Sequence, residues 1–107
     1  MIAIIFEVLP DPERKTQYLD IAGQLKSELE QIEGFISVER FQSLSNENKL
    51  LSLSFFENEG AVRKWRELPS HRAAQKAGRE NVFTDYRLRV ASVSRDYGMT
   101  ERAQVPK

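Results

Sequence analysis

The apolar run at residues 2–9 constrains the fold of this chain most, because it is typical of a strand with apolar side chains on both faces. Ile4 and Phe6 have one parity, and Ile5 and Leu9 have the other. A strand of this kind needs cover on two sides. A domain with a single layer of helices therefore leaves one side of this strand to another partner.

The rest of the chain alternates helical and strand patterns. The expected elements are a helix between the caps Asp11 and Gly34, strands at 35–42 and 49–57, a helix that Asn58 caps and Pro69 ends, a helix that Ser70 caps and that runs to about Glu80, and a strand at 83–94. This order predicts an α+β fold, the ferredoxin-like βαββαβ arrangement with one antiparallel sheet. We expect this domain to occupy residues 1–94 and a short polar tail to occupy 95–107.

Composition excludes several classes of function. The 107 residues carry 16 basic and 16 acidic side chains, one histidine and no cysteine. A net charge of zero disfavours nucleic-acid binding, and the lack of thiols with a single imidazole predicts no metal site. The run at 2–9 is too short, and too soon interrupted by Glu7, for a membrane span or a signal peptide. We therefore expect a cytoplasmic protein without a membrane or nucleic-acid partner.

The strands at 2–9 and 49–57 both carry large apolar residues on two faces, whereas one helical layer covers only one face. At ~25 cal/mol per Å2, hiding even a modest apolar patch contributes several kcal/mol. The sequence therefore predicts a homodimer that packs sheet against sheet. The alternative is a monomer with an apolar sheet face.

The helix at 70–80 is the least generic segment. His71, Ala74, Gln75 and Gly78 follow the i, i+3, i+4, i+7 rule and share one stripe. Because alanine and glycine fill little space, this stripe indicates room for a ligand. The expected aromatic walls are Trp65, Phe83, Phe6, Phe55 and Tyr86. Such a site suits a flat hydrophobic organic molecule.

Each of these residues also has a simpler interpretation. His71 at a helix start is often capped or exposed, Trp65 is often a core residue, and Gln75 can bond backbone or water. No nucleophile-elbow motif and no phosphate-binding glycine loop is present in the sequence.

The run 51–57 with its two phenylalanines, Trp65, Ser70-His71, Ala74-Gln75 and Phe83 resembles the antibiotic biosynthesis monooxygenase domain, up to about Val93. The resemblance implies a dimeric α+β barrel with a pocket between the helices and the sheet of each protomer. Some members oxygenate quinols or anthrone-like aromatics without metal, flavin or another prosthetic group. Others degrade heme.

The resemblance also carries individual positions. Trp65 matches the pocket tryptophan, and His71 matches a position where quinone-forming members place a polar ring. Ala61 stands where those members place an asparagine. Gln75 stands where heme-degrading members place the proximal histidine, and their first-strand asparagine falls at about Glu7. The expected cofactor is therefore none, and heme is disfavoured.

The resemblance thus implies a monooxygenase that uses dioxygen on a small aromatic substrate. We expect His71 to act as base or hydrogen-bond partner, with an unperturbed pKa near the working pH. Gln75 or Asn81 would orient the substrate oxygen atoms. Three aromatic side chains would hold the ring: Trp65, Phe83 and Tyr86. The alternatives are a non-catalytic or stress-related barrel that binds an aromatic ligand, a heme-degrading relative, and a lactone isomerase or dehydratase.

Overall fold

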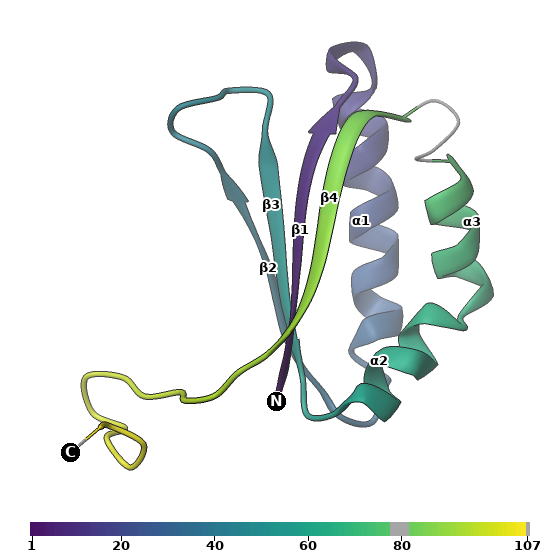
Figure 1. Cartoon of the computed structure of the whole chain (residues 1–107). Coiled ribbons are helices and arrows are strands. Elements are labelled where there is room, and N and C mark those ends of the chain that lie inside the picture. The colour runs from purple at the N-terminus through teal and green to yellow at the C-terminus, as the bar shows by residue number, and fades with distance from the viewer. Residues whose placement is uncertain (78–81, 107) are drawn as a thin grey trace.

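The computed structural model describes residues 1–77 and 82–106, which form one sheet and a layer of helices (Figure 1). In chain order the elements are β1 (Ile2–Pro10), the 3-10 turn η1 (Pro12–Arg14), α1 (Lys15–Leu29), β2 (Phe35–Gln42), β3 (Leu50–Phe56), α2 (Glu59–Arg66), α3 (Pro69–Ala77) and β4 (Phe83–Ser92). The predicted ferredoxin-like α+β fold is confirmed, because strands and helices follow one another in the expected order.

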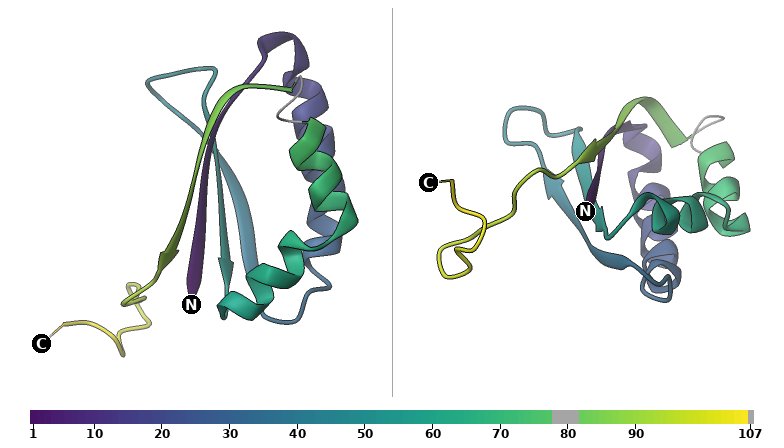
Figure 2. Two further views of the ribbon diagram at one scale, coloured as in Figure 1. Left: turned by 45° about the vertical axis from the view of Figure 1, so that its right-hand side comes forward. Right: turned by 60° about the horizontal axis from the view of Figure 1, so that its bottom comes forward.

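The sheet has the strand order β2-β3-β1-β4, and all neighbouring strands are antiparallel. Figure 2 shows the helices on one side of this sheet, and no described helix covers the other side. Paired residues share a face, so Ser54, Ile4 and Val90 form one row on the helix-covered face. The central strands β1 and β3 supply the floor on which the helices pack.

The first helix begins later than the sequence predicts. Asp11 caps as expected, since its carboxylate accepts a hydrogen bond from the backbone N–H of Glu13 at 2.9 Å. It caps the short turn η1, however, and α1 starts only at Lys15. Pro12 stands in the first turn of η1, where its missing N–H costs nothing.

Gly34 has a different role from the predicted helix cap, because α1 ends at Leu29. Its φ of 92° lies in the left-handed region that favours glycine. A Cβ atom at this position would lie 2.8 Å from the Cβ of Ala61. Gly34 therefore lets the chain enter β2 in close contact with α2.

The second helical region also differs from the prediction in one detail. Asn58 caps α2 as expected, accepting a hydrogen bond from the backbone N–H of Ala61 at 2.9 Å. Pro69 does not end that helix but opens α3, so Ser70 is not the cap of α3. A proline is favoured in a first turn because no helical hydrogen bond needs its missing N–H.

The main core lies between the sheet and the junction of α1 with α2. Its buried members are Ile2, Ile4, Leu29, Phe56, Ala61 and Val62. Phe56 is fully buried, and its ring centroid lies 5.6 Å from those of both Phe35 and Trp65. This aromatic cluster fixes the end of α2 on the sheet.

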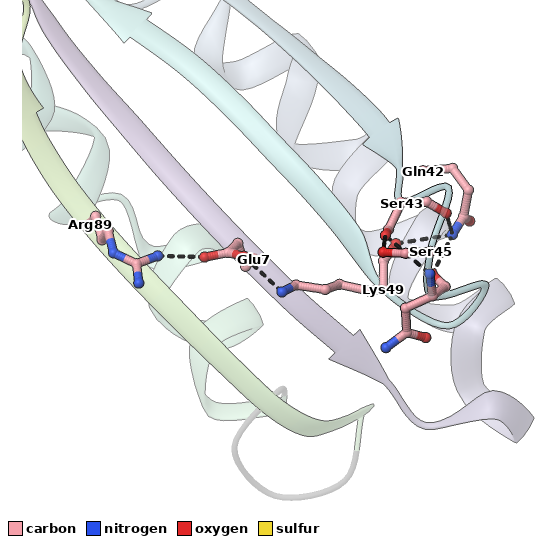
Figure 3. Close-up of polar contacts among 7 residues, drawn as sticks. Glu7, Gln42, Ser43, Ser45, Lys49 and Arg89 are labelled. Carbon is pink, nitrogen blue, oxygen red and sulfur yellow. Dashed lines mark hydrogen bonds and ion pairs between the residues drawn. The ribbon is translucent and has the colours of Figure 1, made fainter.

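The open face is the side of the sheet without a helix, and its apolar residues on the central strands are Ala3, Ile5, Leu9, Leu51, Leu53 and Phe55. Glu7 lies among them and forms ion pairs with Lys49, at 2.8 Å, and with Arg89 (Figure 3). The hydrogen bonds from Lys49 and then Arg89 lower the pKa of Glu7. The open face is thus an apolar surface with a compensated charge.

Beyond β4 the chain leaves the sheet and runs away from the helices (Figure 1). This segment forms its own turn, in which the N–H of Gly98 donates to the carbonyl of Glu101 at 2.8 Å. Arg102 lies over the ring of Tyr97, 5.8 Å from its centroid.

Candidate functional site

A cavity of about 120 Å3 lies between the helix-covered face of the sheet and helices α1 and α3. It is lined by Phe6, Trp65, His71, Gln75 and Phe83, all of which the sequence predicts for the site. The other described lining residues are Ile4, Tyr18, Ile21, Ala22, Leu25, Leu29, Val38, Arg40, Ser52, Ser54, Ala74, Val82 and Leu88. Most of these side chains are apolar, as in sites for small organic ligands.

The cavity exists because small side chains occupy the middle of β3. Phe56 fills the core at the end of this strand, whereas Ser52 and Ser54 leave space above the strand centre. The facing helices contribute alanines, Ala22 from α1 and Ala74 from α3. With large apolar residues at these positions, the helices and the sheet would pack without a gap.

One wall of the cavity is aromatic. The ring centroid of Phe83 lies 5.7 Å from that of Phe6 and 5.4 Å from that of Tyr18, both in edge-on arrangements. Leu88 lines the cavity but is 42% exposed, and Gln75 is exposed as well. The cavity therefore meets solvent between β4 and α3.

His71 is placed by a chain of ring contacts that starts in the core. Trp65 stacks on the fully buried Phe56, with 5.6 Å between centroids and 27° between planes. The ring of His71 lies 4.2 Å from that of Trp65, and only 7% of His71 is exposed. The position of the imidazole therefore depends on the packing of α2 against the sheet.

The electrostatics of His71 differ from the sequence expectation. Burial, and after it the positive charge of Arg66, lowers the pKa of His71 to about 4. The expected unperturbed pKa is therefore corrected, and the imidazole is neutral at pH 7. A neutral imidazole has one N–H donor and one acceptor nitrogen to offer a ligand.

Arg40 and Tyr18 add a polar corner that the sequence analysis missed. An Nη2 hydrogen of Arg40 points to the carbonyl of Ala22 at 3.4 Å. Burial raises the pKa of Tyr18, although the nearby Arg40 acts in the opposite direction. The one available signal was the parity of Arg40, which matches the helix-facing Val38 in the predicted strand.

Three buried polar atoms in the described residues have no hydrogen-bond partner: Arg40 Nε, Trp65 Nε1 and His71 Nδ1. All three belong to side chains that line the cavity. Roughly 90% or more of buried polar groups in proteins have a partner, so such a concentration calls for a cause. These atoms give the cavity hydrogen-bonding capacity that a water molecule or a polar ligand atom can satisfy.

Three further sequence predictions have different outcomes. Phe55 does not line the cavity, because it lies on the open face opposite Ala3, one residue out of phase with Ser54 and Phe56. Tyr86 does not line the cavity; it is 46% exposed and contacts the ring of Phe6, 5.7 Å between centroids. Asn81, like Gly78, lies outside the described residues.

Within residues 1–77 and 82–106, no three His, Asp or Glu side chains come together in a way that would hold a metal ion. None of the described helices combines the length and the apolar composition that crossing a membrane requires.

Comparison with known sequences connects this site to a family. The profile described as antibiotic biosynthesis monooxygenase matches residues 1–77. A protein of Pyricularia oryzae named jasmonate monooxygenase ABM is 45% identical over 94 residues, which cover 88% of this chain and 44% of that protein. The chain thus spans less than half of that relative. The protein YqjZ of Bacillus subtilis is 29% identical over 93 residues, covering 87% of this chain and 79% of that one.

Solved structures share the fold at low sequence identity. A putative antibiotic biosynthesis monooxygenase from Deinococcus radiodurans superposes with a TM-score of 0.82 at 16% identity, covering 92% of this chain and 98% of that one. Rv0793 from Mycobacterium tuberculosis gives a TM-score of 0.81 at 13% identity, covering 91% and 98%. The sequence profile and the 45% identical relative together show that this chain belongs to the antibiotic biosynthesis monooxygenase family.

Proposed function

We propose that this chain is a monooxygenase that uses dioxygen to oxidise a small, largely apolar organic substrate bound in the cavity. The observation that carries the proposal is the buried imidazole of His71, which lines an apolar cavity beside Trp65 and whose Nδ1 has no partner within residues 1–77 and 82–106. A neutral hydrogen-bonding group in an apolar, ring-lined site suits a substrate that reacts as its enolate or phenolate.

The proposed reaction needs no oxidant other than dioxygen. The substrate loses a proton from an acidic C–H or O–H group, and its carbanion passes electrons to O2 and forms a C–O bond. Cleavage of the O–O bond leaves one oxygen atom in the substrate as a carbonyl and releases the other as water. For a methylene group the balance is R2CH2 + O2 giving R2CO + H2O. We therefore propose that the chain works without a prosthetic group.

The described residues have separate roles in this proposal. His71 hydrogen-bonds the substrate oxygen on which negative charge develops, and the Trp65 Nε1 hydrogen is a second donor. Gln75 orients polar substituents at the exposed end of the cavity. Phe83 and Phe6 form the apolar wall that excludes water from the ring.

Two substrate types fit these roles. Quinols and anthrone-like aromatics have the acidic hydrogen that the chemistry requires. The Pyricularia oryzae relative is named a jasmonate monooxygenase, which favours a second candidate, a cyclic ketone that carries a carboxylic acid. Both types contain a flat or nearly flat ring and an enolisable or phenolic oxygen.

An oxygen electrode tests the proposal with a panel of hydroquinones, anthrones and jasmonate. We expect saturable oxygen uptake with at least one compound and a product that has gained oxygen. Saturable quenching of Trp65, the one tryptophan of the chain, without oxygen uptake would instead identify a binding protein. Gln75 stands where heme-degrading relatives have a histidine, and a carboxamide is a poor iron ligand. Added hemin is therefore expected to keep its free Soret band, and a saturable shift would contradict the cofactor-free reaction.

We also propose that two copies pair through the open face. Family membership supports this, and so do the apolar side chains of both central strands on the open face, most of which are only half-buried in the single chain. The ion pairs of Glu7 leave the face without an uncompensated carboxylate, so its burial costs less desolvation free energy than that of a lone charge. The second copy would then supply the cover that the sequence demands.

Replacing Leu53 with glutamate is expected to convert the dimer into monomers, because an uncompensated carboxylate would be buried between the two sheets. Leu53 lies opposite Ile5 at the centre of the open face. Sedimentation velocity measures the change, and Lys26→Glu on the exposed side of α1 is the matched control. A wild-type protein that sediments as a monomer, or a Leu53→Glu variant that stays dimeric, would contradict this pairing.

A further inference from the structure

Arg40 is the one charged side chain among the described residues that line the cavity at neutral pH. It extends from β2 on the helix-covered face, where it pairs with Ser52 of β3. The small serine beside it leaves the guanidinium accessible from inside the cavity. A cation in an otherwise apolar wall is costly unless an anion or several acceptors satisfy it.

The protein itself satisfies Arg40 only in part. Nη2 donates to the carbonyl of Ala22 at 3.4 Å, the long end of the hydrogen-bond range. The Tyr18 hydroxyl also takes a side-chain hydrogen bond from the guanidinium. Nε is buried and has no hydrogen-bond partner in the part of the chain that the structure describes. Among the ion pairs between described residues, none includes Arg40. Of the five N–H groups of the guanidinium, Ala22 and Tyr18 therefore engage a part, and the Nε–H is left for an acceptor in the cavity.

The register of the sheet places different kinds of side chain at the two ends of the cavity. Arg40, Ser52, Phe6 and Leu88 lie in one row across β2, β3, β1 and β4. Three strand spacings separate the ends of this row, about 14 Å between the Cα atoms of Arg40 and Leu88. The cation thus stands at one end, the aromatic floor in the middle and the exposed Leu88 at the other end. A ligand that matches this pattern has one anionic end and an apolar body.

We infer that Arg40 receives the carboxylate of the substrate, so that the cavity selects small apolar acids over neutral ring compounds. Nε–H and a neighbouring N–H of the fork bind the two carboxylate oxygens in the side-on arrangement that suits a planar guanidinium. The apolar body then lies in the part of the cavity lined by Phe6, Trp65 and His71. The inference rests on the proposed function in that it places the acid in the same cavity.

A purely structural role for Arg40 makes a different prediction. If the guanidinium only ties β2 to α1 through Ala22, its loss disturbs the cavity for every ligand alike. If it binds a carboxylate, its loss weakens the binding of acids and leaves the binding of their esters unchanged. An acid and its methyl ester share the same body, so the pair isolates the charge.

The experiment titrates the full chain with jasmonate and with methyl jasmonate and follows the fluorescence of Trp65, which lines the cavity. A second pair is 4-phenylbutyrate and its methyl ester. We expect wild-type protein to bind each acid at least about tenfold more tightly than its ester, because charged hydrogen bonds are the strong ones. Arg40→Gln should bind both compounds with the affinity of the ester. Arg40→Lys should fall between, because an ammonium keeps the charge without the fork.

Lys26→Gln, which removes an exposed positive charge from α1, is the control and should keep the full preference for acids. Equal affinity of acid and ester in the wild type would overturn the inference. Two other results would overturn it as well. One is an Arg40→Gln substitution that lowers the affinities for acid and ester equally, and the other is the absence of saturable quenching by either acid up to about 1 mM. Oxygen uptake separates the two proposals. If oxygen uptake is equal with acid and ester, the role of Arg40 is contradicted and the monooxygenase proposal stands. If the protein binds acids selectively but takes up no oxygen, the role of Arg40 stands and the monooxygenase proposal is contradicted.

Discussion

Replacing His71 with alanine is expected to lower the rate of oxygen uptake at least about a hundredfold. A positioned hydrogen-bonding or proton-accepting group contributes about that factor or more to such reactions. His71 is 7% exposed, and among the described residues its Nδ1 has no partner and no second imidazole lines the cavity to replace the lost contact. An oxygen electrode with saturating substrate measures the effect, and KM should change less than kcat.

Two variants separate a role at the reacting atoms from a role in packing. His71→Asn keeps a hydrogen-bonding group of smaller size and should recover part of the lost rate. Arg72→Ala changes the next residue of α3, which is exposed, and should leave the rate within about threefold of wild type. If His71→Ala turns over at nearly the wild-type rate, His71 has no part in the reaction.

The pH profile provides an independent check on His71. Its pKa falls from an ordinary 6.5 to about 4 on folding, so the unfolded chain binds more protons between these values. Stability linked to His71 is therefore complete above pH 6.5 and is lost as the pH falls toward 4. The imidazole stays neutral through the physiological range, and the rate should show no inflection near pH 6.5. Because the chain has one histidine, its NMR titration is a single curve, and a midpoint near 6.5 would contradict this assignment.

Replacing Phe56 with alanine is expected to destabilise the protein by about 3–5 kcal/mol. Phe56 is fully buried and packs against Phe35 and Trp65, so its removal opens a cavity that rigid neighbours cannot close. That loss is a large part of the 5–15 kcal/mol typical of small domains. Urea unfolding followed by circular dichroism at a fixed protein concentration measures it.

Leu19→Ala is the matched control for this substitution. Leu19 is 44% exposed on α1, where alanine is a good helix former, and its loss should cost less than about 1 kcal/mol. A Phe56→Ala variant that unfolds within 1 kcal/mol or so of this control would show that the aromatic cluster does not hold α2 on the sheet. If the variant folds, Trp65 fluorescence should also change, because Trp65 stacks on Phe56.

The sequence predicts the order of elements well because local patterns determine them. Alternating apolar residues mark the strands, and Asn58 caps its helix as its residue type suggests. The boundaries at Gly34 and Pro69 were harder to predict. Gly34 is fixed by a close approach to Ala61. Pro69 opens α3, whereas the sequence pattern predicts that this helix begins after Pro69. Contacts distant in sequence decide such details.

The site was predictable where a helix stripe or a unique residue marked it, as for His71 and Trp65. Phe55 lies outside the cavity because successive residues of a strand point to opposite faces, and Phe56 next to it points to the helix-covered face. Arg40 was missed because an arginine in an edge strand ordinarily faces solvent. Its inward placement follows from the register of β2 with β3, which a single sequence does not determine.

In β3, the residues that bound the cavity are not the residue that anchors the core. The core that holds the molecule together lies at the Phe56 end of the strand, whereas Ser52 and Ser54 set how much room a guest molecule finds. Replacing one serine with threonine, valine or leucine would reduce the cavity volume stepwise and leave the core unchanged. Natural selection can therefore tune the range of compounds accepted at two adjacent inner positions, without rebuilding the scaffold around them.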